Sequence, residues 1–141
     1  MATWNKYNQF VEDLCTGKHD LTAAGNVVKM MLTNTAPNAA THVVKADVVE
    51  ISAGNGYVAG GVDTQNGMTE SGGVATVTAV DIVWTAAGGS IGPFRYAVAY
   101  NDTQASPVKP LIGWYDYGSS ITVLDTETFT VDFGASWFTV T

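Results

Sequence analysis

Two histidines and one cysteine are the side chains in this sequence whose types suit nucleophilic or metal chemistry. His19 and His42 stand in polar surroundings beside turn residues, and neither belongs to a His-x-His or His-Glu-x-x-His pattern. We expect both to be solvated loop residues.

Cys15 precedes His19 at a spacing that can pair a thiol with a base, but Gly17 between them disfavours one continuous helix. We therefore expect Cys15 to be a small buried or half-buried apolar residue. As a lone cysteine it forms neither an internal disulfide nor a Cys-rich zinc site.

Carboxylates that work in pairs are the next candidates for chemistry. Asp116 lies between Tyr115 and Tyr117 and follows Trp114, and aromatic neighbours of this kind are common in sugar sites. A glycosidase needs a second carboxylate across the substrate. Strand alternation puts Asp116 and Trp114 on one face and the two tyrosines on the other, and no second acid is placed nearby. The acidic run 125–127 is typical of a hairpin turn.

The glycine-rich stretch Gly54–Tyr57, followed by Gly60 and Gly61, superficially resembles a phosphate-binding loop. It lacks the Gly-Lys-Ser/Thr ending, and no helix clearly follows it. Asn55-Gly56 is better explained as a tight turn that needs positive φ. We therefore expect no catalytic residue, no cofactor, no metal and no enzymatic activity.

The composition describes a globular protein with a largely neutral surface. Of 141 residues, 46% are hydrophobic and only 13% are charged, against about 25% charged in typical domains. This length is enough for one domain with a real core. A surface rich in Thr, Ser, Asn and Gly suits a protein that works in an assembly, where burying charges is costly.

The charge balance excludes nucleic acid as a main partner. Thirteen acidic and six basic residues give a net charge of −7. Binding to phosphates needs clustered Lys and Arg, and the basic residues here are scattered. They are Lys6, Lys18, Lys29, Lys45, Arg95 and Lys109.

No targeting or membrane segment is expected. The first ten residues lack the apolar stretch of a signal peptide. No apolar run approaches the roughly 18 residues of a membrane span. We expect a protein that stays in a reducing cytoplasm, or leaves it by a route without a signal.

The elements that position these residues are mainly strands. Candidate strands are Val27–Thr33, Tyr57–Asp63, Val74–Thr85, Phe94–Tyr100, Leu111–Tyr117, Phe129–Phe133 and Trp137–Val140, separated by turns rich in Gly and Asn. The segment Thr41–Ser52 fits a short helix or a turn-rich connection better than a strand. This spacing predicts an all-β fold, an antiparallel β-sandwich that is jelly-roll-like, over residues 22–141.

Alternation within the strands predicts core residues. Phe94, Tyr96 and Val98 should share one inward face, because they alternate with smaller or charged neighbours. Phe129, Val131 and Phe133 should do the same.

The first segment, residues 1–21, is predicted to be a helix or an arm. Trp4, Tyr7, Phe10, Val11 and Leu14 form an apolar stripe at helical spacing, with Thr3 as a cap and Gly17 as a stop. Two interpretations are open: a helix packed on its own domain, or an arm that docks on a neighbour. The second makes Trp4, Tyr7 and Phe10 a candidate interface, because aromatic anchors are typical of interface hot spots.

Six segments that span nearly the whole chain carry a resemblance. They are Thr3–Leu14 (TWNKYNQFVEDL), Leu32–Pro37 (LTNTAP), Glu50–Gly61 (EISAGNGYVAGG), Gly88–Asp102 (GGSIGPFRYAVAYND), Pro110–Val123 (PLIGWYDYGSSITV) and Glu127–Phe133 (ETFTVDF). Together they resemble a family of small structural proteins of tailed-phage virions.

The resemblance implies a non-enzymatic virion protein, in the first place a capsid decoration (cement) protein that binds and stabilises the lattice of the major capsid protein. Its implied partners are the major capsid protein and neighbouring copies of itself, as a homo-oligomer on the capsid surface, assembled in the host cytoplasm. The alternative is a tail-associated structural, receptor-binding or glycan-binding component. That alternative would use exposed aromatic residues such as Trp114 and Tyr115.

Overall fold

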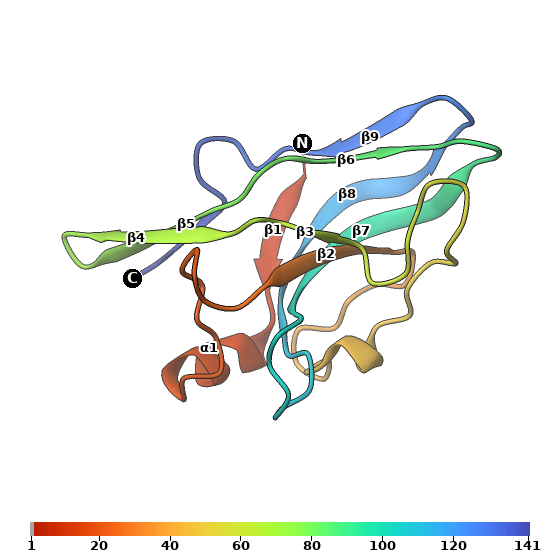
Figure 1. Cartoon of the computed structure of the whole chain (residues 1–141). Helices are drawn as coiled ribbons and strands as arrows, with labels where there is room; N and C mark the ends of the chain where they lie inside the picture. The colour runs from red at the N-terminus through yellow and green to blue at the C-terminus, as the bar shows by residue number, and fades with distance from the viewer. Residues whose placement is uncertain (1) are drawn as a thin grey trace.

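The computed structural model describes residues 2–141 as antiparallel sheets with one short N-terminal helix (Figure 1). The expected all-β class is confirmed. The elements in chain order are β1 (Thr3–Lys6), α1 (Asn8–Cys15), β2 (Val28–Thr33), a 3₁₀ turn (Lys45–Asp47), β3 (Val62–Asp63), β4 (Gly67–Ser71), β5 (Val74–Thr78), β6 (Ile82–Thr85), β7 (Ile91–Asn101), β8 (Leu111–Val123), β9 (Thr128–Val131) and β10 (Phe138–Val140).

The strands form two layers around a main core. One layer is a five-stranded sheet in the order β1-β8-β7-β2-β3. The other combines the sheet β10-β5-β4 with the pair β6-β9. Aromatic and aliphatic side chains from both layers fill the space between them, among them Phe94, Ile112 and Val131, none of which is exposed. The β4–β5 hairpin projects from the body, on the side where α1 and the C-terminal end lie (Figure 1).

The five-stranded sheet is buried on its other face as well. A second cluster there contains Met31 from β2, Val98 from β7 and Leu111 from β8. The long connection between β2 and β3 helps to cover this face, because Val48 belongs to the cluster and Val44 bridges to Pro110. The central strands are therefore apolar on both sides, as in sheets covered on two faces.

The expected shared face of Phe94, Tyr96 and Val98 is wrong, although all three are buried. Phe94 belongs to the main core, whereas Tyr96 and Val98 belong to the second cluster. The pairing register between β7 and β8 shifts between Phe94 and Tyr96. Such a bulge adds a residue and exchanges the faces that follow it. The other expected trio, Phe129, Val131 and Phe133, does lie at the main core.

The N-terminal segment differs from the expected helix at its start. Thr3–Lys6 is a strand that pairs with β8, with Trp4 opposite Tyr115. Helix α1 begins only at Asn8, and it ends before Gly17, whose φ of 73° fits the expected stop. Sheet pairing outweighs the helical pattern here: all four residues of β1 pair with β8, and the ring centroids of Trp4 and Tyr115 lie 5.0 Å apart across the pair.

Other element bounds also differ from the expectations, and β8 continues past the expected end at Tyr117 to Val123. Val74–Thr85 is two strands, β5 and β6, that belong to different sheets. Only the end of Tyr57–Asp63 is a strand, and β4 falls in a stretch with no predicted element. The 3₁₀ turn confirms the reading of Thr41–Ser52 as turn-rich. None of the helices in residues 2–141 is long and apolar enough to cross a bilayer.

Candidate functional site

An apolar groove lies between α1, β1 and β10. It has a volume of about 630 Å³. Its lining residues are Trp4 and Lys6 from β1; Phe10, Val11, Leu14 and Cys15 from α1; and Phe138, Thr139, Val140 and Thr141 at the end of the chain. Only one of these side chains, that of Lys6, carries a charge.

Aromatic stacking forms the floor of the groove. The rings of Trp4 and Phe138 are stacked, with centroids 5.3 Å apart and planes 13° apart. Trp137 meets Trp4 edge-on at 5.1 Å, and Phe10 meets Phe138 edge-on at 6.0 Å. These contacts join strands from opposite ends of the sequence and extend the main core to the surface.

The structure separates the three residues of the candidate interface. The side chains of Tyr7 and Phe10 are buried within the chain itself, Tyr7 in the second cluster and Phe10 in the main core. Tyr7 offers no surface to a partner, and Phe10 borders the groove with only 3% of its surface exposed, which agrees with a segment packed on its own domain. Trp4 is half-buried and remains at the groove. The interface therefore stays a prediction for Trp4.

The groove holds one of two basic side chains that lack a carboxylate partner within residues 2–141. Those two are Lys6 and Lys18. The other four are paired: Lys29 and Lys109 with Asp102, Lys45 with Glu50, and Arg95 with Asp116. Lys6 is exposed, so an unneutralised cation stands at an apolar groove on an acidic protein.

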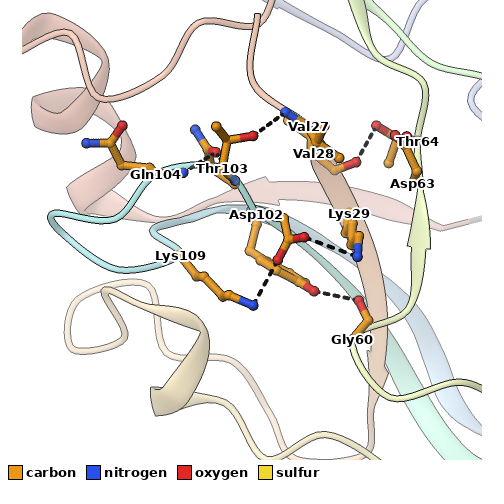
Figure 2. A network of polar contacts seen from close by, with 12 residues as sticks. Val27, Val28, Lys29, Gly60, Asp63, Thr64, Asp102, Thr103, Gln104 and Lys109 are labelled. Atoms are coloured by element: carbon orange, nitrogen blue, oxygen red, sulfur yellow. Dashed lines mark hydrogen bonds and ion pairs between the residues drawn. The ribbon is translucent and has the colours of Figure 1, made fainter.

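A polar network pins the loop that follows β7. Asp102 lies between two lysines, with Oδ2 3.1 Å from Nζ of Lys29 and Oδ1 2.9 Å from Nζ of Lys109 (Figure 2). Thr103 Oγ1 accepts a hydrogen bond from the backbone of Val27. Burial raises the pKa of Asp102, but the two lysines outweigh it and hold that pKa below its usual value. These groups are paired with one another and hold the loop against β2. We call the set Asp102, Lys29, Lys109, Thr103 and Val27 the Asp102 clasp.

A second network lies in the connection between β2 and β3. We call Glu50 and its partners Tyr57, Gly60 and Lys45 the Glu50 clasp. Its carboxylate accepts hydrogen bonds from Tyr57 Oη at 2.7 Å and from the Gly60 amide at 2.6 Å, and it pairs with Lys45. Tyr57 Oη also accepts a bond from the Leu32 amide in β2. Burial raises the pKa of Tyr57, and the hydrogen bond to the Glu50 carboxylate raises it further. This neutral hydroxyl fixes the connection against the sheet.

The expectations for His19 and Cys15 are wrong. His19 is 8% exposed, and its ring packs on Phe10 with centroids 5.1 Å apart. Its Nδ1 lies 3.1 Å from Nδ2 of Asn101, and an amide nitrogen donates, so Nδ1 accepts. Burial lowers the pKa of His19 to about 4. Cys15 is exposed at the groove, because it lies at the last turn of α1.

The remaining candidates for chemistry are placed as follows. His42 is half-buried and its Nδ1 accepts a bond from the Asn38 amide. The expected faces around Asp116 are confirmed: Tyr115 and Tyr117 lie at the main core and Trp114 at the second cluster. Asp116 is engaged by Arg95, whose Nε donates at 2.9 Å. Across residues 2–141 no three His, Cys, Asp or Glu side chains gather in a way that could hold a metal ion.

No family model, curated protein or solved structure matches this chain.

The apolar stripe of the sequence contains four residues that line the groove, Trp4, Phe10, Val11 and Leu14, but it indicates neither Lys6 nor Val140 as their neighbours. Strand order brings them together, and a strand order is not visible in residue spacing. The one available signal was the apolar pair Trp137-Phe138 near the end of the sequence.

Proposed function

We propose that this protein is a non-enzymatic structural protein of a phage virion that decorates the capsid and stabilises the lattice of the major capsid protein. The groove at Trp4 is the observation that carries the proposal, because it gathers apolar side chains into one hollow surface on a protein with a net charge of −7. The sequence resemblance supplies the virion context.

Two further features support a role in stabilisation. The central strands are buried on both faces, the connection between β2 and β3 is held by the Glu50 clasp, and the loop after β7 is held by the Asp102 clasp. A rigid docking body loses little conformational freedom on binding, so more of its contact energy goes to affinity. Many weak contacts around a closed shell then act together.

The glycan-binding alternative loses part of its basis. Tyr115, one of the two aromatic residues it used, is only 9% exposed and lies in the main core. Trp114 is half-buried, with its ring 4.7 Å from that of Tyr7. A single half-buried indole is a small platform for a sugar.

Copy number tests the proposal. Gel densitometry of purified particles against the major capsid protein should give hundreds of copies per virion, since a decoration protein repeats with the lattice. A few copies would instead indicate a tail component and contradict the decoration role.

A particle-stability measurement tests the mechanism. Particles that lack the protein should release DNA at a lower temperature than complete ones, and adding back the pure protein should restore the higher temperature. Val11→Asp, which puts a charge into the groove at a side chain that is 46% exposed, should restore less. Val83→Asp, at a 55% exposed side chain of β6, is the matched control. Identical release profiles with and without the protein would rule out a cement role.

A further inference from the structure

We propose that the groove binds an extended acidic segment of a partner protein, which adds a strand to the free edge of β10 and places a carboxylate beside Lys6. The inference rests on the proposed function for the kind of partner, a virion component, but the binding itself is testable without a virion.

The backbone of β10 has a free edge at the groove. In residues 2–141 this strand is hydrogen-bonded on one side only, to β5, and it borders the groove. An edge strand presents unpaired amide and carbonyl groups, which an extended peptide can satisfy. β1, on the opposite sheet, is also an edge strand at the same groove. The groove therefore suits an extended chain better than a helix.

The apolar lining of the groove complements a strand with apolar side chains on one face. Strand alternation places Phe138 and Val140 on the same face of β10, and both line the groove. Val11 and Leu14 face them from α1, and Val11 remains 46% exposed. An added strand with apolar side chains at alternate positions would bury these groups and remove their surface from water.

The charge of the groove selects an acidic segment. Lys6 has no carboxylate partner within residues 2–141, and the protein carries a net charge of −7. The field of the whole molecule repels an acidic segment from most of its surface, whereas Lys6 attracts it locally. The same net charge disfavours a second copy of this chain as the occupant, because the two copies repel one another.

Synthetic peptides provide the test with the intact protein. The probe is a short peptide of alternating valine and threonine with one central glutamate, capped at both ends, and its counterpart carries lysine instead. Amide shifts in NMR spectra of the labelled protein report the binding site. We expect the glutamate peptide to shift residues of β10 and β1. We expect the lysine peptide to bind about two- to fivefold more weakly, as the loss of an exposed ion pair would give.

Two variants test the role of the charge at Lys6, and one modified peptide tests the backbone pairing. Lys6→Glu should reverse the preference between the two peptides. Lys18→Glu makes the same charge change at the other unpaired lysine and should leave the preference unchanged. Methylating alternate backbone amides of the glutamate peptide should abolish binding, because strand pairing needs those donors.

The outcomes that overturn the proposal are distinct from those that overturn the decoration role. No binding tighter than about 1 mM, shifts that map away from β10, or equal binding of both peptides would each refute it. So would self-association of the free protein through β10, which sedimentation would detect as dimers. A failure in copy number with successful peptide binding would leave the groove assignment intact.

Discussion

The indole of Trp4 lies flat against the ring of Phe138, so that the first strand and the last strand of the fold meet in one aromatic contact. Trp4 belongs to the five-stranded sheet and Phe138 to the sheet of the opposite layer. The contact closes the open end of the main core. Because aromatic pairs of this kind contribute about 0.5–1.5 kcal/mol beyond their buried area, the closure adds to stability as well as shaping the groove.

Removing the first strand should therefore unfold the protein. Deletion of residues 1–16 takes β1 away from β8 and removes the buried rings of Tyr7 and Phe10 from two clusters. We expect far-ultraviolet circular dichroism to show loss of the sheet at 25 °C. A deletion variant that keeps a cooperative melting transition would contradict this and restore the interpretation of an independent arm.

Tyr7 and Tyr57 should respond in opposite ways to loss of the hydroxyl group. Tyr7 is fully buried, and its Oη has no hydrogen-bond partner within residues 2–141. Tyr7→Phe removes an unsatisfied polar group, so the free energy of unfolding should stay equal or rise by up to about 1 kcal/mol. Tyr57→Phe removes the bond to Glu50 and leaves the Leu32 amide unpaired, which should cost about 1–3 kcal/mol. Urea denaturation of the two variants provides the measurement.

Acid should weaken the fold through His19. Burial lowers the pKa of this residue to about 4, below the value of 6.5 for a free histidine. The unfolded chain therefore binds a proton at pH values where the native protein does not, so stability is complete above pH 6.5 and declines as the pH falls toward 4. The loss between pH 7 and pH 5 should be about 2 kcal/mol.

The variant His19→Gln isolates this effect. It keeps a polar side chain opposite Asn101 but cannot titrate, so its free energy of unfolding should change less between pH 7 and pH 5 than that of the unmodified protein. His42→Gln is the matched control and should retain the full change. Parallel slopes for all three proteins would show that His19 does not cause the acid sensitivity.

Asp102 should matter more than either of its lysines. Asp102→Asn leaves two cations facing each other without the carboxylate between them, and we expect a cost of about 1–2 kcal/mol in the free energy of unfolding. Lys109→Ala leaves the pair with Lys29 in place and should cost about 0.2–1 kcal/mol. Thermal melts at low salt compare the two variants. An equal loss of stability would mean that the pair between Asp102 and Lys29 adds nothing.

The core beside the bulge gives a further stability prediction. Phe94 is fully buried and its ring lies 4.8 Å from that of Phe129. Phe94→Ala should cost about 3–5 kcal/mol, the usual price of truncating a buried phenylalanine. Val83→Ala, on the exposed face of β6, should change stability by less than about 0.5 kcal/mol. Denaturant unfolding measures both, and a small effect at Phe94 would place it outside the core.

Residue patterns predict the strands whose own sequence has a clear β pattern. They do not predict strands that form only because a distant segment pairs with them. β2, β7, β8, β9 and β10 follow from runs of β-branched and aromatic residues between turns. β4 has a weak pattern, because Gly67–Ser71 is partly exposed and is formed by pairing with β5 across the Gly72-Gly73 turn. The strand β1 was hidden by a helical stripe that continues through it.

The errors at the candidate site have the same origin. His19 looks solvated in sequence because its neighbours are polar, yet Asn101, from the end of β7, and Phe10 enclose it. Cys15 looks like a core residue by type, but α1 turns its last residues toward the groove. Lys6 gains its significance only when β10 lies beside it. Each of these depends on which strands are neighbours, which spacing along one chain does not encode.

Burial of β7 on both faces has a consequence for how its alignment is maintained. In a sheet with one wet face, sliding a strand by one residue exposes its core side chains, and that cost fixes the register. Tyr96, Ala97, Val98, Ala99 and Tyr100 are all buried, so the same slide would expose none of them to water, but it would move tyrosine rings into spaces that fit alanine. Side-chain size therefore discriminates between alignments, and directional contacts at the ends of this stretch add to it: Arg95 with Asp116 at one end, and Asn101 with Asn26 and His19 at the other. In this doubly covered strand, the alternation of large and small apolar side chains does the work that a boundary between core and water does in other sheets.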